Sequence, residues 1–210
     1  MQNNTPTPLV HVIDDDAALL RALTFLLESA GWCVVPHASA EAFLAAWSAP
    51  APPGCLVLDI RMPLMSGLEL QRVLASRDIM LPVIFLTGHG DVSMAVEAMK
   101  LGARDFIEKP FKDQILLDAV AMAVRCDLAR HDGDTVRRAL CERLGRLSPR
   151  EMEVARLVAE GLPYKVIGRR LDISDRTVQV HRLHLMEKLG IHSAAELAQM
   201  MILAGHTGTT

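Results

Sequence analysis

The feature that most constrains the fold is a regular alternation, in the first 125 residues, between short apolar runs and longer segments with helical spacing. The five apolar runs are residues 9–13, 33–36, 55–60, 82–88 and 104–110, and the five helical segments are residues 18–31, 40–47, 68–76, 92–102 and 115–124. Near-continuous apolar runs are typical of strands that helices cover on both faces. The pattern therefore predicts an α/β domain over residues 1–125, with a doubly wound five-stranded parallel sheet.

The segment that follows differs sharply in composition. Residues 126–146 are polar and charged, and Gly133 lies between two aspartates. This composition predicts a linker that is helical only in its second part. A short flexible tail is expected at residues 206–210.

Between linker and tail, residues 147–205 predict a small all-α domain of four short helices. Ser148, Pro149 and Glu151 have the spacing of a helix cap, a first helical proline and a capping box. Ser174 and Gly190 have the spacing expected for the two ends of the third helix.

Charge is distributed unevenly along the chain. Residues 1–130 hold 10 basic and 15 acidic side chains, whereas residues 131–210 hold 12 and 10. Five basic residues against two acidic ones lie between Lys165 and Arg182. This bias indicates contact with phosphates, although a solvated helix face has the same composition.

The bulk composition narrows the class of protein. Half of the residues are hydrophobic, so the chain can bury a large core. No basic start precedes an apolar run, so we expect no signal peptide, no membrane span and a cytoplasmic location. The four cysteines form no C-x-x-C pair, which argues against a disulfide framework and a zinc site.

Acidic side chains come at the ends of two of the predicted strands. Asp14, Asp15 and Asp16 follow the first apolar run, and Asp59 ends the third. Chemistry in such sheets gathers where the strands end. Clustered carboxylates there predict a site for Mg²⁺.

The next two strands end in Thr87 and in Lys109 followed by Pro110. A hydroxyl and an ammonium suit the oxygens of a phosphoryl group, and a metal-shielded carboxylate can accept that group. Each residue also has a simpler interpretation: Asp16 as a helix cap, Thr87 as a turn cap, Lys109 as a surface lysine. The four strand ends together favour the phosphoryl site.

The motifs VIDDD, LVLDIRMPLMSG, LTGHGDV and DFIEKPF, in this order, resemble the receiver domain of two-component response regulators over residues 9–124. The resemblance implies a flavodoxin-like fold in which a sensor histidine kinase phosphorylates Asp59. It further implies that Mg²⁺ is bound by Asp14, Asp15, Asp59 and the backbone carbonyl of Arg61. Thr87 and Lys109 would bind the phosphoryl group.

The same resemblance implies three further features. Phe106 would be the switch aromatic, although a plain core aromatic is a serious alternative, and Lys109–Pro110 would be a cis peptide. Arg61 and His89 are positions that tune the lifetime of the phosphoryl group, and our hypothesis is that they shield it from water.

The helix predicted over residues 175–189 has two distinct faces. Val178, Leu185, Met186 and Leu189 recur at helical spacing and predict the buried stripe. The opposite face carries Arg176, Gln179, Val180, Leu183 and Glu187. On DNA, Gln179 is suited to reading adenine, and the two aliphatics to contact with thymine methyl groups. The residues that would contact phosphates are Arg176, Thr177, Arg182 and Lys188, with Lys165 nearby.

Residues 147–197 resemble the LuxR/FixJ-type helix-turn-helix domain, through TV-x-VHR followed by KLG. The resemblance makes residues 175–189 the recognition helix, residues 164–171 its scaffold, and residues 194–203 a dimerisation helix through Leu197, Met201 and their neighbours. Gln179 stands where Lys is frequent in the family, which should weaken phosphate attraction.

These patterns predict a FixJ/NarL-type regulator, not an enzyme, that binds promoter DNA when Asp59 is phosphorylated. Its expected partners are a sensor histidine kinase, RNA polymerase and a second copy of itself. Two alternatives remain open: a Mg²⁺-dependent phosphatase with Asp59 as nucleophile, and a DNA-binding regulator that ignores phosphorylation. Arg61 weakens the first, because such hydrolases keep an acid two residues after the nucleophile.

Overall fold

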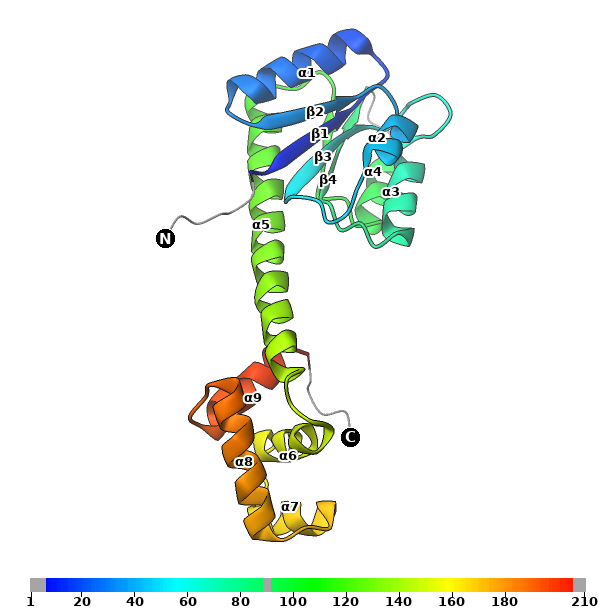
Figure 1. Cartoon of the computed structure of the whole chain (residues 1–210). Coiled ribbons are helices and arrows are strands. Elements are labelled where there is room, and N and C mark those ends of the chain that lie inside the picture. The colour runs from blue at the N-terminus through cyan, green and yellow to red at the C-terminus, as the bar shows by residue number, and fades with distance from the viewer. Residues whose placement is uncertain (1–6, 89–91, 206–210) are drawn as a thin grey trace. The chain divides into compact units, whose positions relative to one another are not determined.

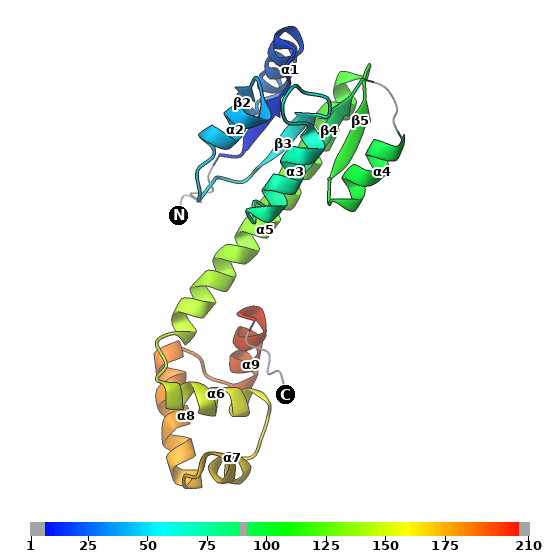
Figure 2. The same ribbon diagram turned by 90° about the vertical axis from the view of Figure 1, so that its right-hand side faces the viewer.

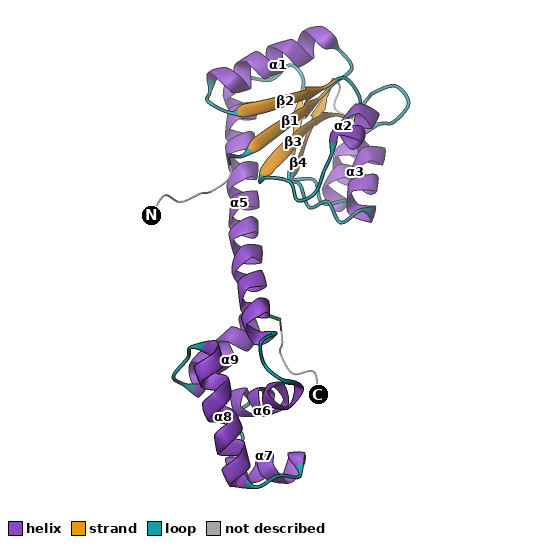
Figure 3. Ribbon diagram, in the orientation of Figure 1, coloured by secondary structure: helices purple, strands orange, loops and turns teal. Residues whose placement is uncertain are grey.

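The chain folds into two compact units, Met1–His131 and Asp132–Thr210. The computed structural model describes residues 7–88 and 92–205. The tail expected at residues 206–210 lies outside the described residues. All strands of the described chain belong to the first unit, as the colouring in Figure 3 shows.

The first unit is built on one parallel sheet. Its strands are β1 (Leu9–Ile13), β2 (Cys33–His37), β3 (Gly54–Asp59), β4 (Val83–Thr87) and β5 (Asp105–Glu108). They lie in the order β2-β1-β3-β4-β5, and every pairing is parallel. The predicted doubly wound α/β fold is confirmed, with its strands within two residues of the expected bounds.

Five helices cover the two faces of this sheet (Figure 1). The helices are α1 (Ala17–Ser29), α2 (Ala40–Ala46), α3 (Gly67–Ser76), α4 (Val92–Lys100) and α5 (Asp113–Leu144). α1 and α5 pack on one face, and α2, α3 and α4 on the other.

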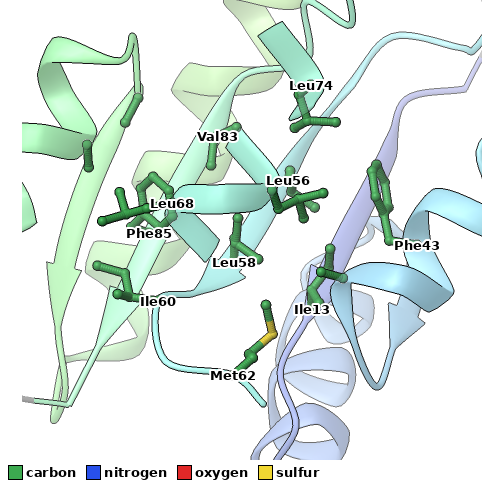
Figure 4. Packing of buried hydrophobic residues seen from close by; sticks show 14 of the residues in the cluster. Ile13, Phe43, Leu56, Leu58, Ile60, Met62, Leu68, Leu74, Val83 and Phe85 are labelled. Carbon is green, nitrogen blue, oxygen red and sulfur yellow. The ribbon is translucent and has the colours of Figure 1, made fainter. Parts of the chain in front are cut away.

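The strand β3 shows why the sheet needs helices on both sides. All six of its residues are buried. Leu56 and Leu58 point into the cluster with Phe43 and Phe85, shown in Figure 4, while Cys55 and Val57 point into the other cluster. Because side chains alternate along a strand, a strand buried on both faces reads as a continuous apolar run.

Helix α5 is longer than the sequence pattern indicates. It was expected to end at residue 124, but it runs without a break through Gly133 to Leu144, as Figure 2 also shows. The linker expected to be partly helical is therefore helical over most of its length, and the two compact units divide between His131 and Asp132. One glycine inside a helix costs only about 1 kcal/mol, which a 32-residue helix tolerates.

The second unit contains α6 (Pro149–Ala159), α7 (Tyr164–Leu171), α8 (Asp175–Leu189) and α9 (Ala194–Leu203). The predicted caps are present: Ser148 and Glu151 form a capping box, Ser174 caps α8, and Gly190 ends α8 with a left-handed conformation. The four expected helices are thus confirmed.

Helix α9 uses its apolar residues differently from the expectation. Leu197 and Met201, predicted as dimer contacts, are 0% and 3% exposed and belong to the core of the second unit. The large apolar side chains that α9 exposes are Ile202 and Leu203, at 61% and 51%. The expected role of Leu197 and Met201 is therefore wrong, because the core of so small a domain needs them.

Candidate functional site

Two buried carboxylates stand side by side where β1 and β3 end. Asp59 is the last residue of β3 and Asp14 follows β1, the strand paired with β3. The two residues are only 7% and 2% exposed. Adjacent parallel strands end at the same edge, so the apolar runs before these acids are what bring them together.

A single ammonium group joins the two carboxylates. Lys109 Nζ donates to Asp59 Oδ1 at 2.6 Å and to Asp14 Oδ2 at 3.0 Å. Lys109 follows β5, and its bond to Pro110 is cis, as the family resemblance implies. The predicted association of Asp14, Asp59 and Lys109 is present in the fold.

Burial and charge act in opposite directions on these groups. Burial raises the pKa of Asp59 above its ordinary value, and the hydrogen bond from Lys109 offsets this only in part. Burial alone would lower the pKa of Lys109, but its hydrogen bonds to Asp59 and Asp14 outweigh burial and raise it. The site is thus a desolvated charge cluster that depends on its lysine.

Backbone donors hold the other oxygens of the carboxylates. Asp59 Oδ2 accepts from the Arg61 N–H at 2.7 Å, and Asp14 Oδ1 accepts from the Asp16 N–H at 2.9 Å. Asp16 caps α1 through the N–H groups of Ala18 and Leu19, as expected. The carboxylates of Asp14 and Asp59 are therefore oriented by the chain itself.

The loop after Asp59 depends on a glycine that the sequence analysis did not single out. A Cβ on Gly67 would lie 2.4 Å from the Asp59 carbonyl oxygen, and the Gly67 N–H donates to the Ile60 carbonyl at 2.9 Å. Only glycine allows this approach. The signal was present in the sequence, as a glycine eight residues after Asp59 and directly before the helix predicted over residues 68–76; in the structure it is the first residue of α3.

The residues fit a small hard cation. Within residues 7–88 and 92–205, no group of three or more His, Cys, Asp or Glu side chains is arranged to hold a metal ion, and Asp15 is exposed. Two carboxylates do converge on one cation, the ammonium of Lys109. Mg²⁺ usually takes one or two carboxylates together with waters and phosphate oxygens, so this donor set suits it.

The other predicted receiver residues lie around this cluster. Thr87 ends β4 and is buried, and its carbonyl accepts from the Lys109 N–H at 2.6 Å. Phe106 is half-buried against the cluster of Figure 4. The side chain of Arg61 is exposed, while His89 lies outside the described residues.

In the second unit, α8 presents the polar face that the sequence predicts. Val178, Leu185, Met186 and Leu189 are buried, which confirms the predicted stripe. On the opposite side Val180 and Leu183 are 46% and 57% exposed.

The polar residues predicted to contact DNA differ in exposure. Arg176, Gln179 and Lys165 are exposed, whereas Thr177 and Arg182 are half-buried. Thr177 shares a hydrogen bond with Ser174, and the guanidinium of Arg182 lies over the Tyr164 ring.

Lys188 has a role that the sequence did not reveal. Its ammonium donates to both carboxylate oxygens of Glu151, at 2.8 and 2.7 Å. Glu151 also accepts from the Ser148 N–H in the capping box of α6. Lys188 therefore ties α8 to the start of α6, and its charge is already compensated inside the unit.

Residues 10–121 match the family described as response regulator receiver domain. The chain belongs to the response regulator family. A second match, to the luxR family of bacterial regulatory proteins, covers residues 145–201. This response regulator thus combines a receiver with a LuxR-type DNA-binding domain, and it is a transcription regulator controlled by phosphorylation.

Relatives of this response regulator include transcriptional regulatory protein FixJ from Azorhizobium caulinodans, 47% identical over 93% of this chain and 92% of the relative. FixJ from Rhizobium meliloti is 46% identical over 93% and 96%. These homologues are transcription regulators. A receiver joined to a DNA-binding domain implies a sensor kinase and DNA as partners, and receiver domains generally bind Mg²⁺ at the phosphorylation site.

Solved structures agree with this assignment. The response regulator StyR has a TM-score of 0.83 and 40% identity over 94% of this chain and 99% of that chain. Full-length FixJ from B. japonicum has a TM-score of 0.58 and 42% identity over 96% and 99%. Among the described residues of our chain, no helix has the length and apolarity that crossing a membrane requires.

Proposed function

We propose that Asp59 accepts the phosphoryl group from a sensor histidine kinase and that the modified protein binds promoter DNA through α8. The observation that carries this proposal is the convergence of Asp14 and Asp59 on Lys109 at the ends of β1 and β3. A buried carboxylate with a cation in contact is prepared to receive a negatively charged group. The same protein carries an exposed polar helix face suited to DNA.

The transfer requires little from the protein beyond position and charge. An Asp59 carboxylate oxygen forms a bond to phosphorus while the phosphorus–nitrogen bond of the kinase phosphohistidine breaks, and its electron pair returns to the imidazole. Lys109, in contact with Asp59, balances charge on the phosphoryl oxygens, and the Thr87 hydroxyl donates to one of them.

We propose that Asp14, Asp15, Asp59 and the Arg61 carbonyl hold Mg²⁺. When bound, Mg²⁺ neutralises the repulsion between the carboxylates and the phosphoryl oxygens. The backbone N–H groups of Arg61 and Asp16 each bind one oxygen of the Asp59 and Asp14 carboxylates and so fix the orientation of both groups. Asp15 is exposed, so its carboxylate would be accessible to the ion.

Output would pass through the part of the receiver around Phe106. We propose that movement of Thr87 and Phe106 changes the surface of α4, β5 and α5 and promotes dimerisation. Exposed apolar side chains on α4 and α5 support an interface: Val96, Met99, Ile115 and Met122 are 46–50% exposed. Ile202 and Leu203 replace Leu197 and Met201 as candidate contacts in the second unit.

On DNA, α8 would lie in the major groove. Gln179 would read adenine, Val180 and Leu183 would contact thymine methyl groups, and Arg176 would contact phosphate. Thr177, Arg182 and Lys165 would support the phosphate contacts from the edges of this face. The bound dimer would act on RNA polymerase in the cytoplasm, as a regulator without catalytic turnover of its own.

The first test maps the phosphorylated residue. The full chain is treated with acetyl phosphate and Mg²⁺, the acyl phosphate is trapped by borohydride reduction, and the peptide is identified by mass spectrometry. We expect modification of Asp59 in wild type and none in Asp59→Asn. Labelling of Asp14 or Asp15 instead, or steady release of phosphate from small phosphate esters, would contradict the proposal.

The second test defines the DNA target. Wild type with and without acetyl phosphate is incubated with random duplex DNA, beside Asp59→Asn, and bound sequences are read. Enrichment of a two-fold symmetric site in phosphorylated wild type is expected. Equal enrichment in all three samples would leave DNA binding intact but remove phosphorylation from the mechanism.

A further inference from the structure

We propose that Asp127 fastens helix α5 to strand β3 and thereby transmits the state of Asp59 to the part of α5 beyond it. This inference rests on the proposed function of Asp59. The receiver match ends at residue 121 and the LuxR match begins at residue 145. Asp127 lies between the two, in a segment that its polar composition suggests is only a linker.

The Asp127 carboxylate is fully buried although the segment around it is highly charged. Its side chain is 0% exposed. One oxygen, Oδ2, accepts from the Gly54 N–H at 2.9 Å, across 73 residues of sequence. The helix is therefore bound to the first residue of β3 through a charged hydrogen bond, which is stronger than a neutral one.

The second oxygen is held from the helix itself. Oδ1 of Asp127 accepts from Arg130 Nε at 3.1 Å and from Nη2 at 2.6 Å. His131 Nε2 lies 3.6 Å from Oδ2. Because both oxygens are engaged, the carboxylate is oriented, and its buried charge has a partner.

Gly54, the residue of β3 that Asp127 binds, is closely packed in the sheet. A Cβ on Gly54 would lie 1.9 Å from the Leu9 carbonyl oxygen, so the backbone of β3 is pressed against β1 at this residue. β3 lies between β1 and β4, and all six of its residues are buried. Asp127 therefore binds α5 to a closely packed residue of the sheet, so that a displacement of β3 acts on the helix.

Gly54, which Asp127 binds, and the phosphoacceptor Asp59 are the two ends of one strand. β3 begins at Gly54 and ends at Asp59. A rearrangement that phosphorylation imposes on the end of β3 has a direct mechanical route along six residues to the helix anchor. From the anchor, α5 continues unbroken to Leu144 in the second unit.

The position of the anchor along α5 also supports a positioning role. The fully buried apolar residues that α5 contributes to the receiver end at Val124, with Leu128 only half-buried. Asp127 and Arg130 are thus among the last receiver contacts before the division after His131. A directional charged contact defines the rotation of the helix there more strictly than an apolar contact would.

The test compares Asp127→Ala with Asp134→Ala in the full chain. Asp134 is a matched control, because it is an acid two turns further along α5 whose ion pair with Arg137 is exposed. Three quantities are measured: the rate of Asp59 phosphorylation by acetyl phosphate, amide hydrogen exchange at Gly54 and residues 124–131, and the gain in DNA affinity on phosphorylation.

For Asp127→Ala we expect phosphorylation within about twofold of wild type and exchange at least about tenfold faster at Gly54. The gain in DNA affinity should fall to nearly none, while Asp134→Ala keeps the wild-type gain. Arg130→Ala, which keeps the bond to Gly54, should retain more of the gain than Asp127→Ala.

Two results would overturn the proposal that Asp127 fastens α5 to β3 and transmits the state of Asp59. The first is unchanged hydrogen exchange at Gly54 in Asp127→Ala. The second is faster exchange in this variant combined with the wild-type gain in DNA affinity on phosphorylation. The second would reduce Asp127 to a stabilising residue. If wild type itself gains no DNA affinity on phosphorylation, the proposed function fails and so does transmission, whereas faster exchange in Asp127→Ala would still support the fastening of α5 to β3.

Discussion

Asp59 is 7% exposed and bonded to Lys109, whereas Val180 and Leu183 on α8 are 46% and 57% exposed and serve no visible purpose in the fold. The receiver site is built from buried charges that hold one another in place. The proposed DNA-binding face is built from side chains that the fold leaves available. Changes in the first region should therefore alter stability and chemistry together, and changes in the second should alter binding alone.

Lys109→Ala gives the largest expected effect on the receiver side of this comparison. It leaves the buried carboxylates of Asp14 and Asp59 without their shared cation. Loss of one partner of a buried ion pair destabilises by about 3 kcal/mol or more. Urea unfolding of the full chain, followed by fluorescence, measures the change. Lys112→Ala, at an exposed position three residues away, should stay within about 0.5 kcal/mol of wild type.

Gln179→Ala tests the exposed face of α8, the second region of the comparison. A lost bidentate contact to adenine should weaken specific DNA binding by about 1–3 kcal/mol, without a measurable change in unfolding. Binding to the selected duplex, measured by fluorescence anisotropy, gives the first value, and urea unfolding the second. A loss of stability equal to the loss of binding would show that this face belongs to the fold.

Lys188 tests the comparison within one helix. It lies on α8, the helix with the exposed face, but its ammonium forms an ion pair with Glu151 inside the fold, as Lys109 does with the receiver carboxylates. Arg176→Ala should lower the slope of log affinity against log salt by about one unit, as expected for a lost phosphate contact. Lys188→Ala should leave that slope unchanged and destabilise the second unit, since its ammonium is bound to Glu151.

The ion pair between Lys188 and Glu151 predicts that the stability of the second unit depends on pH. The hydrogen bond from Lys188, together with the Ser148 N–H, lowers the pKa of Glu151 from 4.5 to about 2. Because the pKa of Glu151 is lower in the folded protein than in the unfolded chain, its ionised carboxylate stabilises the fold at pH values above about 4.5. This stabilisation is lost as pH falls from about 4.5 to about 2. Because Lys188 is partly exposed, we expect a loss of about 1–2 kcal/mol.

Unfolding of the second unit at pH 5 and pH 3, in wild type and Glu151→Gln, measures this loss. The variant should be less stable at pH 5 and should lose less than wild type on acidification. Glu153→Gln, which alters an exposed ion pair with Arg150, is the control. Its stability should fall between pH 5 and pH 3 by the same amount as that of wild type.

The smallest expected effect comes from a histidine pair in the receiver. His11 Nδ1 and His37 Nε2 are 3.1 Å apart, with Phe43 and Trp47 against the His11 ring. Burial, and then the charge of His37, lower the pKa of His11 from 6.5 to about 4. The unfolded chain therefore binds more protons between these values, and stability is lost as pH falls from about 6.5 to about 4.

We expect the receiver to lose about 1 kcal/mol between pH 7 and pH 5, a value reduced because His11 is only partly buried. His11→Gln should remove most of this loss, and His184→Gln, an exposed histidine of α8, should not. Equal pH dependence in all three proteins would contradict the interpretation.

The receiver side of the comparison was largely predictable from sequence. Asp14 and Asp59 come at the ends of apolar runs, and Lys109 follows the short strand DFIE. Parallel strands bring such ends to one edge. Local patterns also predicted the Ser148 and Ser174 caps, because a cap depends on residues three positions apart. The exposed face of α8 followed from helical spacing alone.

What could not be predicted depends on contacts between distant residues. Lys188 reads as a basic residue of a DNA-binding helix, and only the fold brings it to Glu151, 37 positions earlier. Asp127 likewise reads as part of a polar linker until Gly54 is beside it. The dimer role of Leu197 and Met201 rests on the family resemblance, which identifies a helix without showing which of its apolar side chains the core of this domain buries.

The measurement that tests the account most directly is the affinity of the full chain for its selected duplex, with and without acetyl phosphate and Mg²⁺, in wild type and Asp59→Asn. We predict that phosphorylation raises the affinity of wild type by about tenfold or more and leaves Asp59→Asn unchanged. Equal affinity in all four samples would contradict the account, because the buried charge cluster would then have no influence on the exposed face of α8.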